Sequence, residues 1–467
     1  MHRWRTALPA VLLPALALVT VAAVAPPAGA APGDWTRIST GTGGIIYQSS
    51  LHRTPDGVLH VLYPKTNGGD TATYGHAAID ADGSLAGQDD VLAPGWATLD
   101  VSPALIGDGD GLRAVFGGIF DVNPGFWSDG RMYTATAAED GGVWTLPAEA
   151  VGQSHSAYGS YGTAAVELAD GTPVAAYPLN SDIVWHVGTG PEADQSYAVG
   201  SCCAYSLGMA DDNGDVWIGW YQNGSTAATN GTFVKQILPT VGPTMKAPGS
   251  SQGTDSLPTG KVALVARTGG GVYAAYCVGY PTCGHIGLWK VGSSQVTTVP
   301  SSRYAADIAL SPGPSGRIWV AWSDNIPRVR AVRTGVSGSG FGPVRTLGTP
   351  PHQDSVYNVS TDGTTGRGDV VINVGNGFWH TQVAPGLTLK ASPTTWQHGT
   401  KKKVTFTVTD AGDHVGGAKV KVGSRTCTTA AAGTCAITFP AGTPKGTLVG
   451  KATHSGYGAG SVRLKVT

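Results

Sequence analysis

One arrangement of hydrophobic and polar residues recurs seven times between residues 55 and 375. Each copy is a polar turn with a glycine, followed by a strand of alternating small and large apolar residues. The copies are PDGVLHVLY (55–63), DGLRAVFGG (110–118), DGTPVAAYP (170–178), NGDVWIGWY (213–221), GGVYAAYCV (270–278), SGRIWVAWS (315–323) and RGDVVINVG (367–375). Asp-Gly and Asn-Gly turns supply the positive φ of tight hairpins. Because these strands are apolar on both faces, we expect each to be covered on both sides by neighbouring sheets.

The spacing of the copies indicates a ring of sheets. The anchoring glycines, from Gly57 to Gly368, are 43 to 60 residues apart. A period near 50 residues with several strands per unit is typical of β-propeller blades. The last copy is short, and segment 34–38 is expected to supply its missing outer strand. The prediction is an all-β, seven-bladed propeller, with six blades as the alternative and an array of β-sandwiches as a further one.

The N-terminus reads as an export signal. Arg3 and Arg5 are followed by an apolar stretch, residues 7–24, and by the small residues Ala28-Gly29-Ala30. This order is typical of a secretory signal peptide, and a membrane anchor is the competing interpretation. No later segment has the ~18 consecutive apolar residues of a membrane span. We therefore expect a signal peptide at 1–30, a propeller at 31–385, and a secreted, extracellular protein, with attachment to the cell wall as an option.

From residue 386 the pattern changes. The strands VTFTVTDAG (404–412) and AKVKV (418–422), the hairpin at 428–439 and the closing SGYGAGSVRLKV resemble bacterial immunoglobulin-like domains. The resemblance implies a β-sandwich at 386–467. Nine Lys and two Arg against two Asp give this segment a charge of +9, while the rest of the chain carries −10. Such a basic module is suited to an anionic cell-wall polymer, and a merely solvated basic surface is the alternative. Nucleic acid is not expected, because interleaved aromatic residues are sparse.

Export predicts that the six cysteines form disulfides. Cys427 and Cys435 bracket one turn, and Cys277 and Cys283 bracket another. This leaves the adjacent Cys202 and Cys203. Either they form a vicinal disulfide, or one of the two local pairings is wrong. No cysteine or histidine spacing fits a zinc site. We expect no metal and no cofactor.

The candidate chemistry lies in the strands that precede the glycine turns, since these are expected to be innermost and to begin at one mouth of the channel. Aromatic faces stack on sugar rings, and carboxylates bind hydroxyls or act as acid and base. For each residue, packing between blades or capping of backbone amides is the competing role. The candidate binding residues are Tyr47, His52, Trp96, His155, Tyr158, Tyr161, Tyr205, Arg303, Tyr304, His352 and Tyr357. The candidate catalytic residues are Asp100, Asp255, Asp307 and Asp354.

The repeat and its polar mouth resemble the sialidase-like and related glycan-active propellers, which implies a glycan ligand or substrate. No intact S-x-D-x-G-x-T-W turn is present, and Arg303 is the one arginine clearly at the mouth, where sialidases need three. A glycoside hydrolase for neutral sugars, such as an arabinanase, needs only carboxylates and is slightly favoured. The alternatives are a non-catalytic lectin or adhesin, and a polysaccharide lyase in which His155 or Tyr158 is the base and Arg303 neutralises a uronate.

Overall fold

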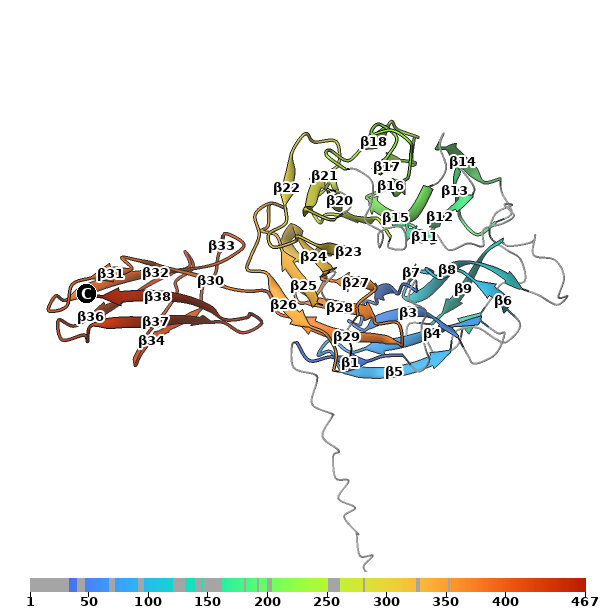
Figure 1. Cartoon of the computed structure of the whole chain (residues 1–467). Coiled ribbons are helices and arrows are strands. Elements are labelled where there is room, and N and C mark those ends of the chain that lie inside the picture. The colour runs from blue at the N-terminus through green and yellow to red at the C-terminus, as the bar shows by residue number, and fades with distance from the viewer. Residues whose placement is uncertain are drawn as a thin grey trace, which may run out of the picture.

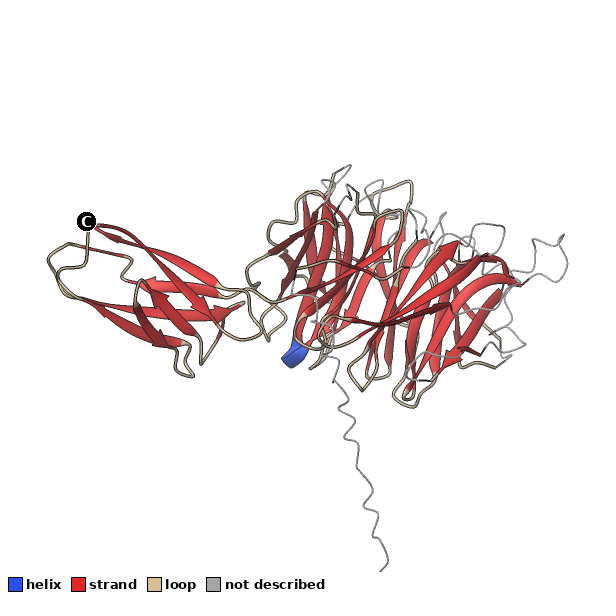
Figure 2. Ribbon diagram, turned by 90° about the horizontal axis from the view of Figure 1, so that it is seen from below, coloured by secondary structure: helices blue, strands red, loops and turns tan. Residues whose placement is uncertain are grey.

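The computed structural model of the chain describes residues 33–39, 47–66, 72–90, 96–120, 131–138, 144–145, 151, 162–179, 182–190, 193–199, 204–250, 261–279, 282–324, 328–351, 353 and 355–467. From Thr36 to Val383 these residues form seven antiparallel sheets that surround a central channel (Figure 1). This arrangement is a β-propeller. The one helical element in the described part is a 3₁₀ turn at Pro314–Gly316 (Figure 2).

The first three sheets follow one another along the chain. Sheet one contains β2 (Ser50–Arg53), β3 (Leu59–Thr66), β4 (Ala72–Ile79) and β5 (Leu85–Asp90). Sheet two contains β6 (Trp96–Leu99), β7 (Ala104–Asp108), β8 (Gly111–Phe120), β9 (Arg131–Ala137) and β10 (Trp144–Thr145), with β6 and β7 both paired to β8. Sheet three contains β11 (Ala164–Glu167), β12 (Pro173–Leu179), β13 (Asp182–Val187) and β14 (Gln195–Ala198).

The next four sheets repeat this order. Sheet four contains β15 (Ala204–Asp212), β16 (Asp215–Gln222), β17 (Gly231–Gln236) and β18 (Thr244–Lys246). Sheet five contains β19 (Ala263–Ala266), β20 (Val272–Val278), β21 (His285–Lys290) and β22 (Val296–Thr298). Sheet six contains β23 (Ala305–Gly313), β24 (Arg317–Asp324), β25 (Arg328–Arg333) and β26 (Arg345–Gly348). Sheet seven contains β27 (Asn358–Asp362), β28 (Gly368–Asn373), β29 (Phe378–Val383) and β1 (Thr36–Arg37).

The ring closes by strand exchange between distant parts of the chain. Strand β1 pairs antiparallel with β29, with Thr36 opposite His380. The prediction that segment 34–38 supplies the missing outer strand is therefore confirmed. Arg53 of sheet one also reaches into sheet seven, where its guanidinium contacts Asp362 at 2.7 Å and Asp369 at 2.6 Å. Backbone pairing within sheet seven and buried ion pairs between sheets seven and one together stabilise the closure of the ring, which we call the seam.

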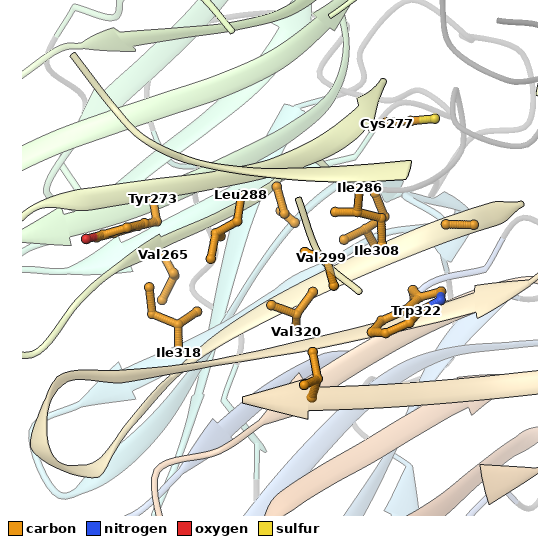
Figure 3. Packing of buried hydrophobic residues seen from close by; sticks show 14 of the residues in the cluster. Val265, Tyr273, Cys277, Ile286, Leu288, Val299, Ile308, Ile318, Val320 and Trp322 are labelled. Carbon is orange, nitrogen blue, oxygen red and sulfur yellow. The ribbon is translucent and has the colours of Figure 1, made fainter. Parts of the chain in front are cut away.

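Strand β24 shows why the sheets must stand side by side. Its alternate residues Ile318, Val320 and Trp322 pack on sheet five, whereas Trp319 and Ala321 pack on sheet seven. All five are almost fully buried. Figure 3 shows the first of these two interfaces, with Val320 and Trp322 facing the side chains of sheet five. Each large side chain buried in this way contributes about 1.5–3 kcal/mol of transfer free energy, and it does so only when the neighbouring sheet is present.

Residues beyond Leu387 form two further sheets packed face to face. One contains β30 (Thr388–Ser392), β32 (Lys402–Asp410), β33 (Asp413–His414) and β36 (Thr434–Phe439). The other contains β31 (Thr395–Trp396), β38 (Gly460–Val466), β37 (Gly446–Thr453), β34 (Lys419–Val422) and β35 (Arg425–Thr428). Both sheets contribute to one apolar core with Phe406 and Leu464. This β-sandwich has its own core and projects from the rim of the ring (Figure 2).

Both local disulfides predicted from the sequence are present. Cys427 of β35 joins Cys435 of β36, so this bond links the two sheets of the sandwich. Cys277 of β20 joins Cys283 across the connection to β21. Cys202 and Cys203 lie outside the described residues, so their pairing stays a prediction.

The sandwich is held to sheet six by an ion-pair cluster. Asp410 accepts a 3.1 Å hydrogen bond from Nε of Arg333 and lies 3.3 Å from Nη1 of Arg317. Asp413 lies 2.8 Å from Nη2 of Arg317 and accepts the backbone N–H of Val336 at 2.9 Å. Because Arg317 begins β24 and Arg333 ends β25, the junction lies at the end of sheet six where the inner strand β23 finishes.

Candidate functional site at the channel mouth

The innermost strands β2, β7, β11, β15, β19, β23 and β27 line the channel. A cavity of about 260 Å³ lies where these strands begin, and this end is called the mouth below. A second cavity of about 700 Å³ lies where they end. Both cavities are bordered by Leu51, Met209, Leu264 and Leu310. Thr361 borders both cavities beside these four apolar residues, which we call the apolar belt.

Buried polar side chains link the sheets around the mouth. The Gln48 amide donates to Asn358 at 3.2 Å, and its oxygen accepts from the Ser102 hydroxyl at 2.8 Å. The backbone N–H of Ser102 donates to Asp100 at 3.0 Å, and the Thr163 hydroxyl donates to the other carboxyl oxygen at 2.6 Å. This network runs from sheet seven through sheets one and two to sheet three. It holds the starts of four inner strands in register.

Asp100 is therefore engaged on both carboxyl oxygens. It is buried, it does not line the mouth cavity, and burial raises the pKa of its carboxyl. The structure gives this candidate catalytic residue a positioning role within the network. Its hydrogen-bond acceptors are occupied by the protein.

Lys261 crosses the mouth. It lies two residues before β19 of sheet five, yet its ammonium donates to the carbonyl oxygen of Pro103, directly before β7 of sheet two, at 2.7 Å. Burial lowers the pKa of Lys261, and the nearby Asp100 carboxylate opposes that shift. Lys261 lines the mouth cavity. Lys261 was not among the residues predicted from the sequence, although a lysine directly before the apolar segment VALVA (262–266) is a signal for it.

Asp307 is the candidate catalytic residue that does line the mouth. One of its carboxyl oxygens accepts the backbone N–H of Val359 at 2.6 Å, which ties sheet six to sheet seven. Burial raises the pKa of Asp307 to about 7, and the backbone hydrogen bonds from Val359 and Ile308 oppose this shift. Among the described residues that line the mouth, Asp307 is the one carboxylic acid. A carboxyl with a pKa near neutrality is able to hold or release a proton at physiological pH.

Three candidate tyrosines lie within three residues of the starts of inner strands in neighbouring sheets. Tyr304 precedes β23, Tyr357 precedes β27, and Tyr47 lies just before β2. Tyr304 and Tyr357 are 39% and 37% exposed, and Tyr47 is half-buried. The Arg303 guanidinium stacks on the Tyr304 ring, with 4.6 Å between its carbon and the ring centroid.

Tyr304 is held in an unusual backbone conformation. Its φ is +68°, and its N–H donates to the carbonyl oxygen of Cys283 at 2.8 Å. A bulky residue with positive φ is strained and persists only when its surroundings fix it. Here the disulfide-linked turn of sheet five supplies that support. The backbone that carries the exposed ring is therefore fixed at the end of the ring of sheets where the mouth lies.

The other candidates are placed differently or lie outside the description. His52 lies in β2 below the apolar belt and lines the second cavity, so it is not part of the mouth. Only the backbone is described for Trp96 in β6 and Tyr205 in β15. The remaining candidates lie outside the described residues, namely Asp255, Asp354, His155, Tyr158, Tyr161 and His352.

Among the described residues, no group of three or more His, Cys, Asp or Glu side chains gathers closely enough to hold a metal ion. In the same residues, no helix has the length and apolar character needed to cross a membrane.

No protein-family model and no curated protein matches the chain. Solved structures do match. The lectin of Aleuria aurantia, solved with α-methyl-L-fucoside, has 11% identity and a TM-score of 0.38 over 88% of this chain and 98% of its own. A thermostable family-43 glycoside hydrolase has 10% identity and a TM-score of 0.34 over 57% of this chain and 97% of its own. An auxiliary nutrient-binding protein from Bacteroides thetaiotaomicron has 11% identity and a TM-score of 0.36, covering 73% and 70%. Similarity at this level carries no argument about what this chain binds.

Proposed function

We propose that the protein is a secreted, seven-bladed β-propeller that binds a glycan at its channel mouth. Residues 1–30 are its signal peptide, 31–385 its propeller and 386–467 an immunoglobulin-like sandwich. Two disulfides within the described residues support an oxidising, extracellular location. The basic sandwich is proposed to dock on an anionic cell-wall polymer.

The observation that carries the glycan proposal is the pairing of polar groups with aromatic rings on one face. Gln48, Lys261 and Asp307 bring an amide, an ammonium and a carboxyl to the mouth. Tyr304 and Tyr357 are exposed and stand directly before the inner strands β23 and β27, at the end of the ring where the mouth lies. Sugars present hydroxyls to polar groups and C–H faces to aromatic rings, so such a surface suits them. Polar groups that fix orientation beside apolar contact area are the usual composition of a small-ligand site.

Glycan-array binding and calorimetry with the mature protein test this proposal. Tyr304→Ala and Tyr357→Ala are each expected to weaken binding of the best glycan about 3- to 10-fold, since each removes one aromatic contact. Tyr304→Phe keeps the ring and is expected to retain binding. Val241→Ala is the control, because Val241 is exposed in the loop between β17 and β18, away from the mouth. Failure of the wild-type protein to bind any glycan would refute the proposal.

Hydrolysis is the second candidate function, and Asp307 is the observation that favours it. Its pKa of about 7 and its place in the mouth suit a general acid. Hydrolysis by the usual route requires two carboxyl groups, and the described residues lining the mouth supply one. Asp255 and Asp354, two of the other carboxylates predicted from the sequence, lie outside the described residues, and one of them would have to supply the second carboxyl. Release of reducing ends from the bound glycan, abolished in Asp307→Asn while binding survives, would instead establish hydrolysis.

A further inference from the structure

The two acidic residues of the C-terminal sandwich are both used at its junction with the propeller. Asp410 and Asp413 are the only acids in residues 386–467. Asp410 is almost fully buried against Arg317 and Arg333, and Asp413 pairs with Arg317. All of residues 386–467 are described. The rest of the sandwich surface therefore carries cations with no acidic side chain among them.

Five of these cations lie on one face of one sheet. The alternating exposure of β34, β37 and β38 places them outward, while the residues between them are buried or partly buried. We call this group the cationic stripe: Lys419, Lys421, Lys451, Arg463 and Lys465.

The strand register orders the stripe diagonally across three strands. Lys421 of β34 lies directly opposite Lys451 of β37. Lys451 lies opposite Ser461, two residues before Arg463 on β38, and Lys465 follows two residues later. Opposed and diagonal neighbours are separated by about 5–8 Å, and residues two apart on a strand by about 7 Å. The five charges thus form a continuous line in which each charge lies within about one Debye length of the next at physiological salt.

The register also places like charges against each other. Lys421 and Lys451 are directly opposed, and like charges in that position destabilise a sheet. Nothing on this face offsets them, because the acids of the sandwich are at the junction. A line of negative charges laid along the stripe would remove the repulsion. Charge complementarity therefore selects a linear polyanion as the occupant.

We propose that the cationic stripe is the docking surface for a linear polyol-phosphate polymer of the cell wall. Four of its five cations are lysines, which bind phosphate as point charges without demanding a fixed orientation. A phosphodiester chain supplies one permanent negative charge per repeat and is flexible enough to follow the diagonal. The inference rests on the extracellular location in the proposed function, and it identifies the surface and the class of polymer.

Binding of the full mature chain to purified poly(glycerol phosphate) tests the stripe, with neutral dextran as the blank. Lys421→Gln/Lys451→Gln is expected to lower the affinity about 10- to 30-fold in low salt. It is also expected to reduce the slope of log affinity against log salt by about 1.5–2. The matched control is Lys401→Gln/Lys403→Gln, which removes the same charge from two exposed positions at the start of β32 in the other sheet. That variant is expected to stay within about threefold of wild type.

Three results would overturn the proposal: no binding by the wild type, equal losses in both double variants, or tighter binding of polygalacturonate than of poly(glycerol phosphate). The thermal midpoint of Lys421→Gln/Lys451→Gln should equal or exceed that of wild type, since a repulsion is removed, and this guards against a folding defect. Binding of the neutral glycan at the mouth is measured in parallel. If the wild type binds the glycan but not the polymer, the stripe proposal fails and the proposed function of the mouth stands. If it binds the polymer but no glycan, the proposed function of the mouth fails and the stripe proposal stands.

Discussion

Asp307 couples the stability of the propeller to pH in a direction that is unusual for a carboxylic acid. Most carboxyls in folded proteins are stabilised as anions, whereas burial at the mouth raises the pKa of Asp307 to about 7. Replacing it by Asn removes the ionisation and keeps an oxygen that can accept the N–H of Val359. The substitution therefore isolates the free energy that ionisation of this buried carboxyl costs the folded protein.

The magnitude follows from the two pKa values of this group. The ordinary value is 3.8 and the folded value is about 7. Between these values the folded protein binds a proton that the unfolded chain releases, so the stability of the wild type falls as pH rises. Each pH unit is worth about 1.4 kcal/mol, so above pH 7 the ionised carboxylate destabilises the fold by on the order of 4 kcal/mol. Asp307→Asn has no carboxyl to ionise, so its free energy of unfolding relative to wild type is expected to rise by the same amount between pH 4 and pH 8.

Urea unfolding of both proteins from pH 4 to pH 8.5, followed by tryptophan fluorescence, measures the difference directly. Asp82→Asn is the control, because Asp82 is exposed and hydrogen bonds from Ser84 lower its pKa. Its effect on stability is expected to stay constant above pH 5. If the free-energy difference between wild type and Asp307→Asn does not change with pH, the carboxyl at the mouth is not held protonated and the reasoning fails.

Two further predictions concern the bonds that close the fold. Arg53→Met is expected to lower the free energy of unfolding by about 3–5 kcal/mol, because it leaves two buried carboxylates without their cation where sheets one and seven meet. Arg328→Met, at a position 41% exposed, is the control and should lower it by under about 1 kcal/mol in the same urea titration. Equal losses in the two variants would contradict a buried ion pair at the seam. Cys427→Ala/Cys435→Ala is expected to lower the stability of the sandwich by about 2–3 kcal/mol, since its loop is short, and dithiothreitol should produce the same decrease in calorimetry of the wild type but none in the variant.

The sequence predicted those parts of the fold that a local pattern controls. The alternation in Val216-Trp217-Ile218-Gly219-Trp220 is set by the two-residue period of a strand, and it correctly placed β16 between two neighbours. The turn before it has φ of +59° at Asn213 and +95° at Gly214, which an Asn-Gly pair adopts readily. The closing strand was predictable because one sheet lacked an outer partner.

The site was less predictable because it depends on contacts between sheets far apart in the sequence. Reading backwards from the glycine turns placed Asp307 and His52 on inner strands, and it placed Asp100 in the segment that leads into one. It did not show that Asp100 is satisfied by Thr163, that Lys261 reaches Pro103, or that His52 lies beyond the apolar belt. Each outcome depends on which neighbouring sheet a side chain meets, and a single-strand pattern does not contain that information.

The placement of charge separates the two proposed binding surfaces. Arg317 begins β24 at the junction with the sandwich, and Asp324 ends the same strand at the other end. Eight residues of extended strand span about 25 Å, which is about three Debye lengths at physiological salt. Charges at the junction are therefore screened from Asp307, Tyr304 and Tyr357. Because the sandwich is fixed to the end of sheet six remote from the mouth, a polymer bound along the stripe leaves the mouth open, and each surface is expected to bind its ligand with the other one occupied.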